Sequence, residues 1–555
     1  MVRLVIDGEE AEVPEGTPVI LAALGQGVFI PHLCYHPALS APASCRLCVA
    51  RVEVGGQSQL TTTCNRAVQE GMVVETRGRE VREARAAALE FILARHPLEC
   101  PVCERSGECE LQDYARQYGR DRGRGGPPRY LPERQELGSR LALDHGRCIR
   151  CTRCVRFVQE IGGVASLAVL GRGASTRIGL AGPESLDHPL SGNLLDLCPA
   201  GALVDPGEEP GPPPWHLRGI DTVCPGCASG CAARADVGEG RLRRLKPRYC
   251  AGQPPWLCDE GRFGWQHVHH PDRLEEPGLR GQGGLDPAPW PEALGRASAI
   301  MAAARGGSAA VVTEGWSTVE EVYLVAHLAR QWRAAICLRP RLAPEGEQVF
   351  ADGFSIAADR SPNSRGTAEV CQLVGVEMIS PDVMWAAIGG GRLRRLFWLG
   401  GDPARVLGPR ELTGLGRLDA LVVQDILPSA LTEVAEVVLP GAAFAEKAGH
   451  FVDRHGRAAS LPAAVSPPAR AQHDWQILSE LAAAGGWAPE ELPPSPEAAL
   501  GRLCALPRPG GGTPLLQGLQ PDPPTATRAA GSDAYGGGWS ALLQRRGFLR
   551  VGGRR

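Results

Sequence analysis

The sequence predicts a multidomain protein in which an α+β region that binds metal precedes an α/β domain. The chain has 555 residues, more than one hydrophobic core usually serves. Of its 19 cysteines, all but Cys337, Cys371 and Cys504 lie in tight clusters before residue 260. From about residue 285, buried strand patterns alternate with helix patterns, which indicates a mainly parallel sheet covered by helices.

The first 78 residues predict a small mixed domain. Val2–Ile6 and residues 11–13 are expected to pair as a hairpin with Asp7-Gly8 at its turn. Residues 17–25 predict a helix closed by glycine, and a loop with three cysteines follows. Residues 79–97 then predict an amphipathic helix.

The α/β domain is expected over residues 276–505. Residues 309–312 predict a buried strand, and Ser317 with Glu320 forms a capping box that opens a helix. Further buried strands are expected at 396–399 and 421–423. The remainder, residues 506–555, predicts a tail rich in glycine and proline.

Composition excludes several classes of protein. The cysteine density is too low for a disulfide scaffold, so the clusters indicate metal binding. No signal-peptide core and no apolar run of about 18 residues is found, which predicts a soluble protein of the reducing cytoplasm. The net charge of −3 predicts no nucleic-acid binding, and the basic run 241–248 is interpreted as a solvated face or a partner contact.

Site one consists of Cys34, Cys45, Cys48 and Cys64. The Cys45-x2-Cys48 turn can present two sulfurs to one metal centre. The ten residues between Cys34 and Cys45 exceed the plant-type ferredoxin spacing, so we expect a ferredoxin-like [2Fe–2S] site with a longer loop. A zinc site is the alternative, although zinc loops more often contain two Cys-x2-Cys pairs.

Site two is His96-x3-Cys100-x2-Cys103-x5-Cys109, which has only three cysteines. A helix-end histidine favoured by the helix dipole is the alternative interpretation of His96. A [4Fe–4S] cluster requires a fourth ligand, however, and a neutral imidazole can supply it. We therefore expect His96 to complete the site and to raise its potential, because imidazole replaces a negative thiolate.

Site three is the run Cys148-x2-Cys151-x2-Cys154 with Cys198-Pro199, a pattern typical of [4Fe–4S] binding. In bacterial ferredoxins the Cys-Pro cysteine serves the other cluster, so Cys198 could instead serve site two. The run is flanked by four arginines that either stabilise the reduced cluster or form a solvated face: Arg147, Arg150, Arg153 and Arg156.

Site four is Cys224-x2-Cys227-x3-Cys231 with Cys258, and it also predicts a [4Fe–4S] cluster. Cys250 is the rival for the fourth position. Cys258 is preferred because it lies in a compact, turn-rich loop, residues 256–264.

The order of these motifs resembles the large iron–sulfur subunit of bacterial respiratory complex I, NADH:quinone oxidoreductase. Sites one to three carry the resemblance. Site four and the C-terminal stretches 399–403, 422–425, 435–441 and 446–457 are similar to the molybdopterin oxidoreductases. The His96 motif is shared with [FeFe]-hydrogenases and NAD-linked formate dehydrogenases.

The resemblance implies an electron relay with one [2Fe–2S] and three [4Fe–4S] clusters. Electrons would come from the flavin- and NADH-binding subunit and leave toward cluster-bearing subunits nearer quinone, on the cytoplasmic side of the plasma membrane, with membrane contact only through the complex. It further implies six segments: a β-grasp ferredoxin domain (1–78), two [4Fe–4S] regions (79–118 and 119–215), a small [4Fe–4S] domain (216–275), a molybdopterin-oxidoreductase-like α/β domain (276–505) and the tail (506–555).

Two other functions remain as alternatives. A formate-type enzyme would bind molybdenum, but the chain has no Cys-His pair of the kind that those enzymes use as metal ligand. We therefore expect the α/β domain to lack molybdenum, and Cys337 and Cys371 to be buried apolar residues. A zinc-stabilised structural module would be colourless. No nucleotide-binding fingerprint is present, so NADH and flavin are not expected to bind to this chain.

Overall fold

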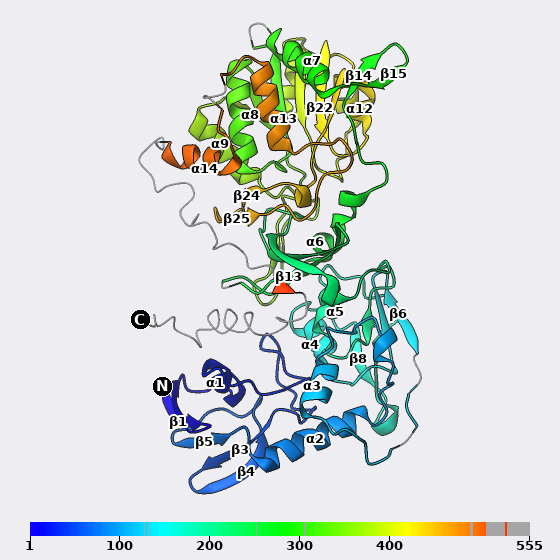
Figure 1. Ribbon diagram of the computed structural model, residues 1–555, viewed down its shortest axis with the longest axis vertical. Helices are drawn as coiled ribbons and strands as arrows, with labels where there is room; N and C mark the ends of the chain where they lie inside the picture. The colour runs from blue at the N-terminus through cyan, green and yellow to red at the C-terminus, as the bar shows by residue number, and fades with distance from the viewer. Residues whose placement is uncertain are drawn as a thin grey trace.

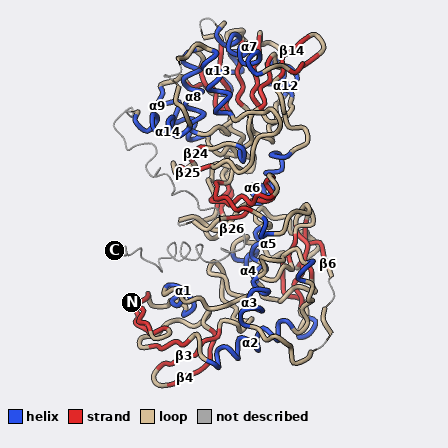
Figure 2. The backbone as a smooth tube through the Cα atoms, in the orientation of Figure 1, coloured by secondary structure: helices blue, strands red, loops and turns tan. Residues whose placement is uncertain are grey.

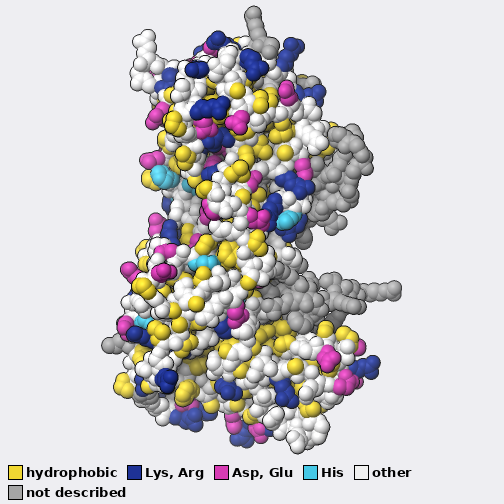
Figure 3. Space-filling view, turned by 180° about the vertical axis from the view of Figure 1, so that it is seen from behind, with side chains coloured by type: hydrophobic (Ala, Val, Ile, Leu, Met, Phe, Trp, Pro, Cys, Tyr) yellow, Lys and Arg dark blue, Asp and Glu magenta, His cyan; other side chains and the backbone are white. Residues whose placement is uncertain are grey.

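The structure is a computed structural model that describes residues 1–126, 128–130, 133–250, 252–304, 307–488, 492–506 and 528–529. The molecule is elongated, with the cysteine-rich region at one end and the α/β domain at the other (Figure 1). Most of the predicted tail lies outside the described residues. None of the described helices is long and apolar enough to cross a membrane. On the face that Figure 3 shows, basic and acidic side chains are interspersed.

A five-stranded sheet of order β2-β1-β5-β3-β4 forms the N-terminal domain. Asp7 and Gly8 both have positive φ, 50° and 91°, as the predicted two-residue turn requires. The parallel pairing of β1 with β5 brings both ends of the domain into one sheet, and α1 packs its apolar side on it. The elements are β1 (Val2–Ile6), β2 (Glu9–Val13), α1 (Val19–Gly25), β3 (Val49–Val54), β4 (Gln57–Thr62) and β5 (Met72–Glu75).

The next region is built largely from loops between short elements (Figure 2). Its one larger helix, α2, ends at Leu93, four residues before the predicted end, so the prediction of a helix to residue 97 is wrong. The elements are α2 (Arg79–Leu93), η1 (Cys100–Val102), α3 (Glu110–Tyr118), β6 (Arg134–Gly138), β7 (Leu141–Asp144), α4 (Arg153–Glu160), β8 (Leu167–Leu170), η2 (Gly173–Ser175), β9 (Arg177–Leu180), α5 (Asn193–Leu197), β10 (Leu203–Val204) and η3 (Pro214–His216).

A small antiparallel sheet lies between the two ends of the molecule (Figure 1). Its hairpins continue into the site-four loops, because β11 ends immediately before Cys224 and β12 begins immediately after Cys231. The elements are β11 (Arg218–Val223), β12 (Ala232–Gly238), β13 (Arg241–Pro247), β26 (Arg528–Ala529), α6 (Asp259–Phe263) and η4 (Gly264–His269).

The C-terminal domain contains an eight-stranded sheet of order β15-β14-β23-β22-β21-β16-β17-β20, in which the six strands from β23 to β20 are parallel. The strands are β14 (Gly278–Gly281), β15 (Gly284–Pro287), β16 (Ala309–Thr313), β17 (Ala335–Leu338), β20 (Met378–Ile379), β21 (Arg395–Leu399), β22 (Ala420–Asp425) and β23 (Val437–Pro440). The strands predicted at 309–312, 396–399 and 421–423 are confirmed as β16, β21 and β22.

Helices cover both faces of this sheet. Val311 packs with α7, α8 and α13 on one face, whereas Val312 packs with α10 and α12 on the other, as in an α/β fold. Cys337 and Cys371 are fully buried in these two cores, as predicted. The remaining elements are α7 (Trp290–Ala302), α8 (Val319–Gln331), β18 (Gln348–Val349), β19 (Ser355–Ile356), α9 (Ser364–Val374), α10 (Pro381–Gly389), α11 (Pro409–Leu415), α12 (Ala430–Val434), η5 (Phe444–Glu446), β24 (Gly449–Val452), β25 (Ala458–Leu461), α13 (Asp474–Ala484) and α14 (Pro496–Ala505).

The capping box of α8 lies one residue later than predicted. Thr318, not Ser317, is the N-cap, and its hydroxyl accepts a hydrogen bond from the Glu321 amide at 3.2 Å. The Glu321 carboxylate in turn accepts a bond from the Thr318 amide at 2.8 Å. The Glu320 side chain instead accepts from His450 Nδ1 at 2.6 Å, so a contact distant in sequence selects between two local alternatives.

Candidate iron–sulfur sites

The four cysteines of site one meet in two pairs. The thiol of Cys45 lowers the pKa of Cys34, and the thiol of Cys64 lowers the pKa of Cys48. Except for half-buried Cys45, these side chains are buried. Two pairs of thiols suit a two-iron cluster, because four cysteine ligands divide evenly between two irons.

Left-handed backbone conformations at non-glycine residues shape the cysteine loops of sites one and three. Ala43 (φ 50°) and Arg46 (φ 59°) lie beside Cys45, and Arg150 (φ 57°) and Thr152 (φ 60°) flank Cys151. Each such residue costs on the order of 1 kcal/mol, and such strain concentrates at binding sites. The two Cys-x2-Cys turns are therefore held in a conformation that the local sequence does not favour.

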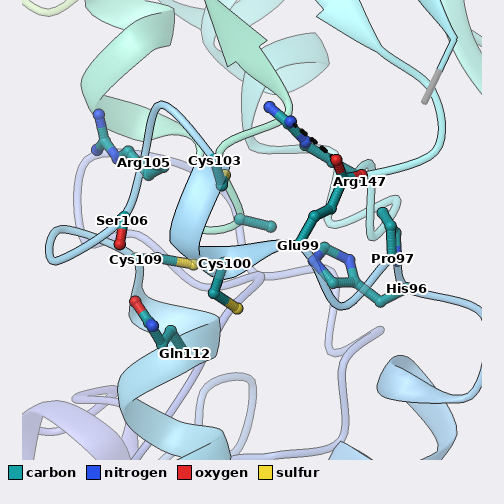
Figure 4. Close-up of a pocket in the computed structure, with 11 residues that line it drawn as sticks. His96, Pro97, Glu99, Cys100, Cys103, Arg105, Ser106, Cys109, Gln112 and Arg147 are labelled. Carbon is teal, nitrogen blue, oxygen red and sulfur yellow. Dashed lines mark ion pairs between the residues drawn. The ribbon is translucent and has the colours of Figure 1, made fainter.

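Site two surrounds a pocket that all four of its predicted residues line (Figure 4). Cys100 begins η1, Cys103 follows it, and Cys109 directly precedes α3. His96 lies in the turn after α2, so the structure does not support its interpretation as a helix-end residue. Burial and the positive charges of Arg147 and Arg129 lower its pKa to about 4. The imidazole is therefore neutral at neutral pH, which is the form that binds a metal.

Site three forms at the start of α4. Burial raises the pKa of Cys148 to about 11 and that of Cys151 to about 12. Cys198, at the end of α5, is close enough for its charge to raise the pKa of each cysteine in the run, including Cys154. It also acts on Cys109 of site two, whose thiol lies 3.6 Å from the carbonyl oxygen of Pro199. Cys198 therefore lies near both sites.

Three of the four arginines around this run are buried, so a solvated face is the wrong interpretation for them. Arg147 forms ion pairs with Glu99 (3.6 Å), Asp144 (3.5 Å) and Glu104 beside site two. Arg156 donates to the carbonyl oxygens of Cys34 (2.5 Å) and Cys151 (3.4 Å). Arg156 thus connects site one to site three directly. The third is Arg153, which is 1% exposed.

Site four brings Cys224, Cys227, Cys231 and Cys258 together at one end of the small sheet. The Cys224 amide donates to the Cys231 carbonyl at 2.9 Å, which closes the loop between β11 and β12. Cys258 caps α6, and its sulfur accepts from the Gly261 amide at 3.3 Å.

Gly261 leaves room between two of these sulfurs. A Cβ at this position would lie 2.5 Å from the Cys224 sulfur and 3.5 Å from that of Cys258. The contact favours Cys258 over Cys250 as the fourth member of the group, because Cys258 also acts with Cys224 and Cys227 to raise the pKa of Cys231. Sequence reasoning missed Gly261; its position three residues after Cys258 is the only local signal.

The site-four loops are bound to the loops of sites two and three. Asn193 on α5 exchanges hydrogen bonds with the backbone of Leu257, at 2.7 and 3.1 Å. On β13, Arg244 and Lys246 both bind the carboxylate of Glu108, next to Cys109. These two basic residues thus make an intramolecular contact, and their interpretation as a solvated face or partner contact is wrong.

Among the described residues, no group of three or more His, Cys, Asp or Glu side chains could hold a single metal ion. Cluster binding is therefore inferred from the loops that meet at each site and from the chemistry of their donor atoms. Thiolates with one neutral imidazole are the donors that iron–sulfur clusters use.

Comparison with known proteins supports this chemistry. Four family models match the chain: "2Fe-2S iron-sulfur cluster binding domain" (residues 1–79), "NADH-ubiquinone oxidoreductase-G iron-sulfur binding region" (85–124), "NADH-quinone oxidoreductase subunit 3, ferredoxin-like domain" (138–204) and "Molybdopterin oxidoreductase" (364–484). The predicted fold class, a ferredoxin domain and [4Fe–4S] region followed by a molybdopterin-oxidoreductase-like domain, is confirmed.

The G subunit of the Streptomyces coelicolor NADH-quinone oxidoreductase is 37% identical over 338 residues, 60% of this chain and 39% of that protein. The G subunit of the Mycobacterium bovis enzyme is 32% identical over 461 residues, 78% of this chain and 55% of that protein. The chain spans about half the length of such relatives. A solved structure of an NAD+-reducing [NiFe]-hydrogenase is 31% identical, covers 38% of this chain and 91% of that chain, and superposes with a TM-score of 0.35.

Proposed function

Since the chain is related to the G subunits of the NADH-quinone oxidoreductases, we propose that it is an electron-transfer subunit of such a complex. It would relay electrons from an NADH- and flavin-binding module toward quinone. Its partners would be that module and the cluster-bearing subunits nearer quinone. It would lie on the cytoplasmic side of the membrane, which it would contact only through the complex.

In this proposal the chain holds one [2Fe–2S] cluster and three [4Fe–4S] clusters, each of which carries one electron at a time when bound. The [2Fe–2S] ligands are Cys34, Cys45, Cys48 and Cys64. The three [4Fe–4S] sets are His96, Cys100, Cys103 and Cys109; Cys148, Cys151, Cys154 and Cys198; and Cys224, Cys227, Cys231 and Cys258.

The observation that carries the proposal is the donor set of site two. One neutral imidazole and three cysteines line one pocket. The same segment matches the iron–sulfur binding region of the NADH-ubiquinone oxidoreductase-G family. The protein side chains move no proton in this relay; they hold iron, exclude water and set the local charge.

The α/β domain would act as scaffold. Open α/β sheets bind ligands at the carboxyl ends of the strands where the strand order reverses, which here lies between β16 and β21. At this point Arg405 forms ion pairs with Glu314 and Asp425, both at 2.6 Å, and all three side chains are buried. A Cβ on Gly400 would lie 2.5 Å from the Arg405 guanidinium. These buried side chains at the switch point of the sheet support the proposal that the domain binds no pterin cofactor.

Metal analysis and low-temperature EPR of the anaerobically purified full chain test the proposal. We expect about 14 irons per chain, no molybdenum, and signals of one [2Fe–2S] and several [4Fe–4S] clusters during reductive titration. Stoichiometric molybdenum would favour a formate-type enzyme, and zinc in place of iron would refute electron transfer.

Substitution of His96 sharpens the test. His96→Cys keeps four ligands at site two but adds a thiolate charge, so the potential of that cluster alone should fall. His96→Ala should destabilise the same cluster. If neither variant changes any EPR signal of a [4Fe–4S] cluster, His96 is not a ligand.

A further inference from the structure

Arg153 makes contacts that no other described arginine combines. Its side chain is 1% exposed although it carries a full charge. One guanidinium nitrogen donates to the Glu110 carboxylate at 2.8 Å and to the Leu197 carbonyl at 3.3 Å. The other donates to the same carboxylate at 3.2 Å and to the Tyr35 carbonyl at 2.9 Å.

Each acceptor is the immediate neighbour of a residue proposed as a ligand. Tyr35 follows Cys34 of site one, and Glu110 follows Cys109 of site two. Leu197 precedes Cys198 and Arg153 itself precedes Cys154, both assigned to site three. The acceptors lie 118, 43 and 44 residues away in sequence, so the contacts are not a by-product of local structure.

The planar fork of arginine suits this task. It presents fixed donors in two directions at once, whereas the ammonium group of lysine is a compact charge on a flexible stem. The pairing with Glu110 leaves the buried group neutral overall. Arg153 therefore acts mainly on the position of the loops. Its effect on cluster potentials is small while the ion pair with Glu110 is intact.

We infer that Arg153 is a positioning residue that fixes the distances among sites one, two and three. This rests on the proposed function, because it takes the four groups as cluster ligands. Electron transfer between buried centres depends steeply on their separation, so one residue bound to three loops sets the spacing of the relay. The four hydrogen bonds of Arg153 given above go to the loops of the first three sites, so site four serves as an internal reference.

The decisive variant is Arg153→Lys in the full chain, assembled anaerobically. It keeps the charge and removes the fork. Arg150→Lys is the matched control: Arg150 flanks the same cysteines, but its hydrogen bonds go to Thr176 and Tyr130, neither of which adjoins a proposed ligand. Iron content, midpoint potentials and the magnetic interaction between reduced clusters are measured by EPR.

We expect Arg153→Lys to keep its iron and its potentials and to lose the native magnetic interactions of site two with sites one and three. The interaction between sites one and three should weaken without being lost, because Arg156 also connects those two sites. Arg150→Lys should keep all of these interactions. Native interactions in Arg153→Lys would overturn the inference. Absence of iron from the unsubstituted protein would instead refute the proposed function, so the two failures are distinguishable.

A variant that loses iron is informative as well. If Arg153→Lys loses the signals of sites one, two and three together and keeps that of site four, Arg153 connects the three loops. Loss of site three alone would show a local structural role and overturn the inference. Glu110→Gln provides a second test, because it weakens only the connection to site two and should leave the interaction between sites one and three unchanged.

Discussion

The cysteine-rich region and the α/β domain are stabilised in different ways. In the α/β domain, helices cover both faces of a sheet, and its buried cysteines pack as apolar side chains. In the cysteine-rich region, loops predominate (Figure 2), and the proposed ligands are themselves members of the hydrophobic clusters: Cys48, Cys64, Cys109, Cys224, Cys227 and Cys258. The stability of the cysteine-rich region should therefore depend on bound iron, whereas that of the α/β domain should not.

Removal of iron gives the largest expected effect. Metal binding contributes on the order of 10 kcal/mol to the folding of small cysteine-rich domains, and without it the loops lose the groups that hold them. After chelation under reducing conditions, hydrogen exchange should accelerate in the loops of sites one to four and remain slow in β16, β21 and β22. Equal loss of protection in both regions would contradict this difference.

The ion pairs of the α/β domain allow the complementary experiment, in which the α/β domain is destabilised and the cysteine-rich region is left unchanged. Arg405→Met leaves Asp425 buried without its ion-pair partner and Glu314 with only the longer pair to Arg339, at 3.7 Å, and loss of one member of a buried pair costs about 3–5 kcal/mol. Protection of β16 and β22 in hydrogen exchange should fall, while EPR signals of all four clusters persist. Arg410→Met is the control, because Arg410 pairs with Asp382 at the surface. Loss of cluster signals in Arg405→Met would show that the two regions do not fold independently.

A third effect follows from the buried group Glu321, Lys447 and Asp474. Burial raises the pKa of Glu321 to about 7, and the charge of Asp474 adds to this, against the opposing effect of Lys447. The folded protein therefore binds a proton at Glu321 more tightly than the unfolded chain does. Its contribution to stability is complete below about pH 4.5 and is lost as the pH rises through about 7.

This dependence is measured as the free energy of opening of α8 by hydrogen exchange. Between about pH 5 and pH 8 it should fall by an amount on the order of 3 kcal/mol. The Gln side chain in Glu321→Gln cannot titrate, yet it keeps an acceptor for Lys447 and for the Thr318 amide. The slope of the opening free energy of α8 against pH should therefore flatten. An unchanged slope in this variant would assign the titration to another group.

Gly261→Ala tests the cysteine-rich region at a single position. The added Cβ would lie 2.5 Å from the Cys224 sulfur, and overpacking of this kind costs about 1–3 kcal/mol. We expect loss or distortion of the site-four EPR signal alone. Gly264→Ala, where a Cβ meets nothing within 4 Å, should leave that signal unchanged. If both variants behave alike, the space beside Cys224 has no role in cluster binding.

These contrasts also show what the sequence could predict. The Cys-x2-Cys spacing predicts ligand loops, although not the left-handed residues within them. The Asp7-Gly8 turn follows from neighbouring residues alone. The role of Arg153 does not, because its acceptors are Tyr35, Glu110 and Leu197, at least 43 residues away. The sequence shows four arginines beside one cysteine run and cannot distinguish the buried ones from the half-buried Arg150. Loops of this kind have no periodic pattern that predicts their tertiary partners.

The smallest expected effect addresses the start of α8, where the sequence offers two overlapping capping boxes. Thr318→Ala removes the cap that the structure shows and should destabilise α8 by about 1 kcal/mol. Ser317→Ala should have little effect on the cap, because Glu320 binds His450 and not the Ser317 amide. Both variants are compared by the denaturant dependence of hydrogen exchange in α8. A larger loss of α8 stability in Ser317→Ala than in Thr318→Ala would show that Ser317 is the N-cap. The local sequence pattern would then outweigh the distant Glu320–His450 contact.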